Sequence, residues 1–100
     1  MTITDNATTA TIRPKGKITA VNAEEFRKSL QSSIEGGVQN LTIDLAEIEM
    51  IDSKGLAVFI MCHQSLAARG GSLTVITAND DMQQLFRVMR LDRHFTVRSA

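Results

Sequence analysis

Residues 41–76 switch between two hydrophobic periods, and this switch restricts the chain to folds in which strands alternate with helices. Apolar and polar residues alternate along residues 41–45, LTIDL, which is typical of a β-strand. Residues 53–69 place apolar side chains at helical spacing and end at a pair of glycines, and residues 72–76, SLTVI, again favour a strand. Because strands that alternate with helices usually pair in parallel through right-handed crossovers, we expect an α/β fold.

The segment before the first helix carries weaker signals. Residues 8–13 are rich in β-branched side chains and predict a strand. Pro14 fixes its own φ angle and Gly16 loosens the backbone, so we expect RPKGK to form a turn that leads into a short strand near residues 17–19. The first seven or so residues are expected to be either flexible or an edge strand of one domain that spans residues 1–100.

The first helix is predicted from signals at both of its ends. Asn22 is placed to cap the helix, with Glu25 reaching back as in a capping box. Val21 and Phe26 have the spacing of a hydrophobic staple. Two consecutive glycines predict where the helix ends, because glycine adopts the left-handed conformation at low cost.

The later elements are predicted from their apolar positions. The first half of residues 53–69 is apolar on nearly all sides, which predicts burial from more than one direction. HFTV near the end of the chain predicts a final edge strand. Asn79 or Asp80 is expected to cap a third helix. The apolar face of that helix consists of Met82, Leu85, Phe86 and Met89.

The composition of this 100-residue chain excludes several classes of function. Eleven basic and eleven acidic residues give a formal net charge of zero, whereas general affinity for nucleic acid or anionic lipid needs an excess of Lys and Arg. The longest apolar run, residues 56–62, is too short to cross a bilayer. The single cysteine, Cys62, suits a reducing compartment and the N-terminus lacks the pattern of a signal peptide, so we expect a cytoplasmic protein.

The stretch IDSKGL, residues 51–56, holds the polar residues that point to a site. Asp52 is a good N-cap, which places Ser53 at the first helical position, where unpaired N–H groups and the helix dipole favour an anion. A phosphate on Ser53 would be tolerated by the fold, while its charge of about −1.5 to −2 would disturb a docked partner. Gly55 would let such a partner approach the backbone. The residues alone favour the simpler interpretation, in which Asp52 and Ser53 only cap a helix.

Other chemistries are poorly supported by the same residues. A serine-hydrolase elbow needs glycine two residues before the nucleophile, where Ile51 stands, and His63 lies ten residues further along the same helix. DSKGL has the wrong order for a phosphate loop, and Asp44 and Asp52 do not form the acidic cluster of a phospho-acceptor domain. One cysteine and two distant histidines make no metal site, so we expect no metal.

The chain from about residue 8 to residue 97 resembles the STAS domain of anti-sigma factor antagonists. The family's hallmark is Asp-Ser-(Ser/Thr)-Gly-Leu at the start of a helix, which DSKGL matches at every position except Lys54. GKITAVNAEEF is similar to the segment before the family's first helix, and MQQLFRVMRLDRHF resembles its closing helix. The resemblance implies the α/β STAS (SpoIIAA-like) fold, a small mixed sheet of four to five strands flanked by three to four helices.

The resemblance also implies a non-enzymatic function in partner switching. In such a switch the unphosphorylated antagonist binds a serine kinase that is also an anti-sigma factor, phosphorylation of Ser53 ends the binding, and a PP2C-type phosphatase restores it. The resemblance implies no nucleic acid, no membrane and no cofactor, and a monomer or weak dimer. The partner-binding residues that it implies are Asp52, Lys54, Gly55, Leu56, Lys17 and Thr19.

Three positions depart from the family pattern. Lys54 replaces a small hydroxyl residue, so it either pairs with a phosphate on Ser53 or alters which kinase binds. Thr19 stands where the family often has Asp, and Arg90 stands where a glycine commonly precedes the last apolar residues.

An alternative function is a constitutive STAS scaffold in a larger signalling assembly that is never phosphorylated. Nucleotide binding by the same loop is a third hypothesis, which no phosphate-loop sequence supports.

Overall fold

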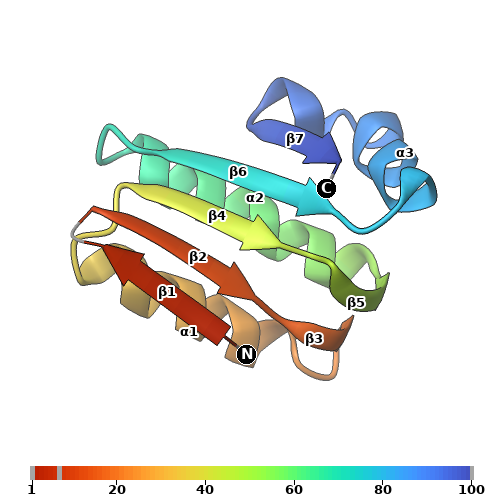
Figure 1. Cartoon of the computed structure of the whole chain (residues 1–100), viewed down its shortest axis with the longest axis horizontal. Coiled ribbons are helices and arrows are strands. Elements are labelled where there is room, and N and C mark those ends of the chain that lie inside the picture. Colours follow the sequence, from red (N-terminus) through yellow and green to blue (C-terminus); the bar gives the residue numbers. More distant parts are fainter. Residues whose placement is uncertain (1, 7, 100) are drawn as a thin grey trace.

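The computed structural model describes residues 2–6 and 8–99, and it describes side chains from residue 8 onward. A five-stranded sheet in the order β1-β2-β4-β6-β7 forms one layer (Figure 1). Strand β1 is antiparallel to β2 and the other three pairs are parallel, which confirms the mixed α/β sheet. The five strands are β1 (Thr2–Asn6), β2 (Thr9–Arg13), β4 (Asn40–Asp44), β6 (Ser72–Thr77) and β7 (Thr96–Ser99).

Two helices cover one face of this sheet, and a third lies beside its far edge. Helix α1 (Ala23–Glu35) and helix α2 (Ser53–Ala67) run behind the strands in Figure 1. Helix α3 (Asp80–Val88) and the short 3-10 helix η1 (Leu91–Arg93) pack against β7. The predicted caps at Asp52 and Asn79 are confirmed, and α2 ends two residues earlier than the sequence predicts.

A second, two-stranded sheet corrects the predictions for two segments. Strand β3 (Lys15–Ile18) begins immediately after Pro14, where a turn is predicted, and pairs in parallel with β5 (Glu47–Ile51), for which no strand is predicted. Pro14 lacks the N–H that would continue the pairing of β2 with β4, so that ladder stops and resumes as the β3–β5 pair. Gly16 has a φ of +81° and marks a bulge in β3, which is why the local sequence resembles a turn.

The hydrophobic core fills the space between the five-stranded sheet and the helices. Burying each large apolar side chain stabilises the fold by about 1.5–3 kcal/mol. The largest fully buried side chains in the sheet and helices are Ile12, Leu41, Ile43, Leu73, Val75, Leu30, Ile34, Phe59, Leu66 and Phe86. None of the helices described here is both long and apolar enough to cross a membrane.

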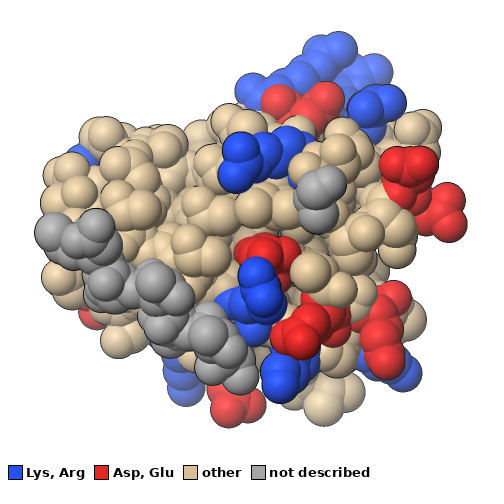
Figure 2. Space-filling view, in the orientation of Figure 1, with Lys and Arg blue, Asp and Glu red and all other residues tan. Residues whose placement is uncertain are grey.

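The opposite face of the sheet is polar. Thr11, Thr42 and Thr74 are half-buried on neighbouring strands in register, and Arg13 pairs with Asp44 at 2.9 Å. Figure 2 shows that charged side chains gather toward the right of this view, the end at which β3 and β5 lie in Figure 1. Alternation of polar and apolar residues along β4 therefore separates a core face from an open face.

Candidate functional site

Ser53 is the first residue of α2, at the point where β5 ends, and its side chain is exposed. The preceding Asp52 has an extended backbone (φ −98°, ψ −176°), and its Oδ1 accepts a hydrogen bond from the backbone N–H of Gly55 at 2.9 Å. Asp52 therefore caps the helix as predicted, and Ser53 lies at the positive end of the helix dipole.

The second carboxylate oxygen of Asp52 ties a distant loop to the head of this helix. Oδ2 accepts a hydrogen bond from the N–H of Ala20 at 2.9 Å, and the N–H of Asp52 donates to the carbonyl of Ile18 at 3.2 Å. The hydrogen bonds from Gly55 and then Ala20 hold the pKa of the Asp52 carboxyl below its ordinary value. The charged carboxylate thus connects the β3–α1 loop with α2.

The β3–α1 loop is held from inside by Asn22. Its Nδ2 donates to the carbonyl of Lys17 at 2.7 Å, and its Oδ1 accepts from the N–H of Thr19 at 2.9 Å. The predicted capping box is therefore wrong, because the Asn22 side chain bonds backward to the loop and makes no cap hydrogen bond in α1. Lys17 is exposed on β3, where it pairs with Met50, and Thr19 is half-buried next to Ala20, whose N–H binds Asp52.

Val21 lies at the tip of the same loop and is 96% exposed. The predicted hydrophobic staple is wrong, because Phe26 is buried in the core while the loop turns Val21 outward. The sequence did not predict this exposure, since Val21 next to a helix start has the same local pattern as a staple.

Gly55 and Leu56 lie inside the protein. A Cβ atom on Gly55 would lie 2.3 Å from the carbonyl oxygen of Ile18, and Leu56 is buried in the core. The expectation that Gly55 offers bare backbone to a partner is therefore wrong. Glycine is needed here because α2 packs directly on β3, and this close contact fixes where the head of the helix lies. Lys54, between Ser53 and Gly55, is exposed.

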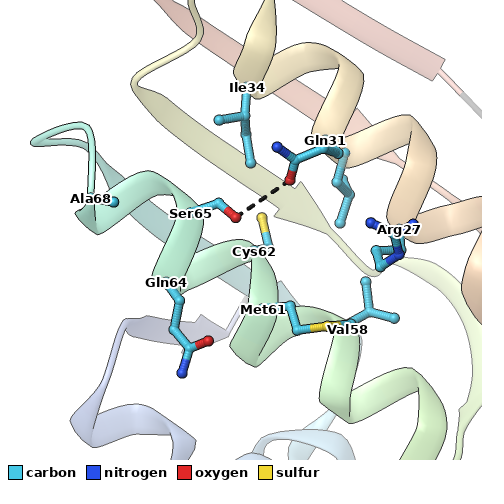
Figure 3. A pocket seen from close by; sticks show the side chains of 10 residues that line it. Arg27, Gln31, Ile34, Val58, Met61, Cys62, Gln64, Ser65 and Ala68 are labelled. Carbon is cyan, nitrogen blue, oxygen red and sulfur yellow. Dashed lines mark hydrogen bonds between the residues drawn. The ribbon is translucent and has the colours of Figure 1, made fainter.

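An apolar groove runs from Lys54 along the boundary between α1 and α2. Its first part, about 410 Å³, is lined by Ala20, Lys54, Ala57 and Met61 among others. It shares Met61 with a second part of about 430 Å³, which Figure 3 shows between the two helices. The exposure of Met61 and of Ile60 also corrects the prediction that the first half of α2 is buried from several sides.

The structure brings the two histidines closer than the sequence predicts. The rings of His63 and His94 lie 6.1 Å apart between centroids, because the segment before β7 returns beside α2.

Within residues 2–6 and 8–99, no group of three His, Cys, Asp or Glu side chains is placed to hold a metal ion. The Asp44 carboxylate accepts a hydrogen bond from the Arg13 guanidinium, and the Asp52 carboxylate accepts hydrogen bonds from the backbone N–H groups of Gly55 and Ala20. Both carboxylates thus have structural roles.

The comparisons with known proteins identify the family and agree with this fold. The sequence profile of the STAS domain family matches residues 1–100. The anti-sigma-B factor antagonist of Listeria monocytogenes is 32% identical over 77 residues, which cover 76% of this chain and 67% of that protein. The chain therefore belongs to the STAS domain family, and within it to the anti-sigma factor antagonists. Because these antagonists are non-enzymatic regulators, the assignment agrees with the expectation that the chain is not an enzyme.

Solved structures of similar proteins share the fold. An anti-sigma factor antagonist from Mycobacterium paratuberculosis has a TM-score of 0.86 at 20% identity, covering 97% of this chain and 82% of that one. SpoIIAA in its unphosphorylated form has a TM-score of 0.73 at 17% identity, covering 92% of this chain and 94% of that one. Bacillus SpoIIAA in its phosphorylated form has a TM-score of 0.75 at 17% identity, covering 96% and 88%. These likenesses confirm the SpoIIAA-like fold.

Proposed function

We propose that this chain is a partner switch controlled by phosphorylation of Ser53. The unmodified protein binds a serine kinase that is also an anti-sigma factor, and so frees the sigma factor. The observation that carries the proposal is the exposed hydroxyl at the first position of an Asp-capped helix, in a chain that belongs to the anti-sigma factor antagonists. SpoIIAA, a protein of the same fold, exists in unphosphorylated and phosphorylated forms, which supports a switch of this kind.

The chemistry at Ser53 is a phosphoryl transfer for which the kinase supplies ATP and the base. The Ser53 oxygen attacks the γ-phosphorus, the bond to the bridging oxygen of ADP breaks, and the hydroxyl proton passes to the kinase's base. A PP2C-type phosphatase reverses the modification by hydrolysis, in which water attacks the phosphorus and inorganic phosphate leaves. The antagonist itself contributes the oxygen and its position on the helix.

The phosphate acts on the partner more than on the fold. An exposed anion at a helix N-terminus gains typically 0.3–1 kcal/mol, and the nearby charged carboxylate of Asp52 opposes that gain. A charge of about −1.5 to −2 pressed against a docked protein costs far more. A loss of roughly 2–3 kcal/mol in the complex weakens binding by tens- to about a hundredfold. The domain stays folded while the complex dissociates.

The surface that the kinase contacts is proposed to surround Ser53 on two segments. Lys17 comes from β3, and Thr19 and Val21 come from the loop that Asp52 holds in place. Lys54 and Met61 come from α2 and line the adjoining groove. Gly55 and Leu56 support this surface from below, because they are buried and set the position of the helix. The partner is therefore proposed to contact a surface that combines the apolar side chain of Val21, the two lysines and the Ser53 hydroxyl.

The test incubates the protein with ATP and a serine kinase of the anti-sigma factor type, followed by mass spectrometry. We expect one phosphate on Ser53, none on Ser53→Ala, and loss of kinase binding by Ser53→Asp. Ser32→Ala, which changes an exposed serine on α1, is the matched control and should behave as wild type. Phosphate only at other residues, or full binding by Ser53→Asp, would refute the switch. The latter result, together with a stable oligomer, would favour a constitutive scaffold.

Lys54 is tested by restoring the small hydroxyl residue of the family with Lys54→Ser. If Lys54 pairs with the phosphate, phosphorylated Lys54→Ser should lose its phosphate to a PP2C-type phosphatase at a changed rate while binding the kinase normally. If Lys54 selects the kinase, unphosphorylated Lys54→Ser should bind the same kinase with an affinity that differs from wild type. Unchanged kinetics and affinity would show that Lys54 has neither role.

A further inference from the structure

The corner where α3 meets η1 exposes two large apolar side chains. Val88 is 64% exposed and Met89 is 51% exposed. The residues on either side are anchored, since Phe86 is fully buried and Leu91 is 3% exposed. The apolar pair is therefore held in place by the core on both sides and is displayed on an ordered surface.

Three exposed arginines lie close to this apolar pair in the chain. Arg87, Arg90 and Arg93 are all exposed, and Asp92 is the one acidic residue within residues 87–93. None of the ion pairs found among the described residues involves any of the three arginines. Figure 2 shows basic side chains with an acidic one among them at the edge where α3 and η1 lie in Figure 1. We call Arg87, Val88, Met89, Arg90 and Arg93 the α3–η1 corner.

Arg90 adopts a backbone conformation that favours glycine. Its φ is +60° and its ψ is 25°, in the left-handed region, and it is the one non-glycine residue with positive φ in the part of the chain that the structure describes. A side chain in this conformation costs free energy that glycine would not cost. Glycine would form this turn at lower cost. We therefore infer that the arginine side chain has a role other than forming the turn.

We propose that the α3–η1 corner binds an acidic peptide segment of a partner protein, with an apolar residue of that segment packed on Val88 and Met89. Arginine binds carboxylates through two parallel hydrogen bonds, and three arginines on one corner provide several such donors. Methionine adapts its shape to apolar partners, and Arg and Met are enriched at protein interfaces. A membrane surface fits less well, because membrane-binding amphipathic helices bury a face of Trp, Phe or Leu, whereas the corner exposes one valine and one methionine.

This inference does not depend on the switch at Ser53. The corner lies at the end of α3, while Ser53 begins α2, and the two sites share no residue. The attraction between the corner and an acidic segment is between exposed charges, which salt screens over a Debye length of about 8 Å at physiological ionic strength. Binding at the corner is therefore expected to weaken as salt is added.

The test is selection of binders from a phage-displayed random peptide library on the intact protein, with counter-selection on Arg87→Glu/Arg93→Glu. We expect enriched peptides with several acidic residues and an apolar residue between them. A synthetic copy of the best peptide, labelled with fluorescein, should bind the double variant at least tenfold more weakly by fluorescence anisotropy. Lys15→Glu/Lys28→Glu makes the same charge change at two exposed residues elsewhere and should bind as wild type.

Arg90→Gly separates loss of binding from loss of folding. It removes one charge and relieves the left-handed conformation, so we expect a higher melting temperature together with weaker peptide binding. Enriched peptides without acidic residues, equal binding by the arginine variants, or no enrichment over the counter-selection would overturn the proposal. Arginine-dependent binding to phosphatidylserine vesicles without any peptide binding would also overturn it, in favour of a lipid ligand.

Discussion

Asp52 determines the geometry of the site at the scale of single residues. One carboxylate oxygen bonds the N–H of Gly55 within its own helix, and the other bonds the N–H of Ala20 on the β3–α1 loop. The first bond is predictable because an N-cap and its acceptor lie three residues apart. The second joins residues 32 positions apart and has no local sequence signal. Prediction from sequence therefore places Ser53 on its helix but not beside Val21.

The pH dependence of stability is expected to report the state of Asp52. Its lowered pKa means that the folded protein binds the proton more weakly than the unfolded chain. Its stabilising contribution is therefore complete above the ordinary aspartate pKa of 3.8 and is lost as the pH falls through the lower, folded value. Asp52→Asn should lose less stability than wild type between about pH 5 and pH 2, measured by urea unfolding. Equal losses in both proteins would contradict this assignment.

Gly55→Ala is expected to destabilise the protein by about 2–3 kcal/mol, because overpacking against backbone is costly. The added Cβ would lie 2.3 Å from the Ile18 carbonyl oxygen, so α2 would have to move away from β3. Thermal unfolding of Gly55→Ala and of Lys54→Ala, an exposed neighbour, makes the comparison direct. Lys54→Ala should stay within about 0.5 kcal/mol of wild type. Equal stability of the two variants would show that α2 does not pack closely on β3.

The break in the parallel ladder is the decisive feature at the scale of elements. The β2–β4 pair stops at Pro14 and continues as the β3–β5 pair, which carries the chain to the head of α2. EIEM alternates polar and apolar residues, but the run is short and glutamate has low strand propensity, so no strand is predicted there. Its strand conformation comes from pairing with residues 15–18, about 30 positions earlier in the chain. Tertiary contact thus overrides the local preference here.

Hydrogen exchange should show which of the two sheets opens locally at lower free energy. Strands β4 and β6 are hydrogen-bonded on both sides, whereas β3 and β5 pair only with each other. The smaller sheet should therefore open locally at lower free energy than the centre of the five-stranded sheet. We expect the backbone amides of β3 and β5 to exchange faster than those of β4 and β6 in NMR exchange experiments. Equal protection of all four strands would show that the two sheets open as one unit.

Aromatic contacts link the helices at the scale of the whole molecule. The ring centroids of Phe26 and Phe59 lie 5.9 Å apart, those of Phe59 and Phe86 lie 5.4 Å apart, and those of Phe86 and Phe95 lie 6.3 Å apart. All four phenylalanines of the chain thus form one series through α1, α2, α3 and the segment before β7. Tilted and edge-to-face pairs of this kind add to the stability that burial provides.

Cys62 should report global unfolding. It is buried between α1 and α2, and burial raises the pKa of its thiol to about 12. The reactive thiolate is then on the order of a thousandfold rarer near pH 8 than for an ordinary thiol of pKa 9.0. We expect iodoacetamide to label the native protein very slowly and the urea-unfolded protein at the rate of a model thiol. Rapid labelling of native protein would show that the groove between the helices opens readily.

The sequence by itself determined the parts whose causes lie in neighbouring residues. Caps, periodicity and paired glycines give α2, α3, β4, β6 and the position of Ser53 at a helix start. Only the tertiary structure decided which surface surrounds that serine. Val21 faces outward and Gly55 inward because β3 pairs with β5 and brings the loop of residues 17–22 against α2. Such pairing depends on the packing of distant segments, which no short stretch of sequence encodes.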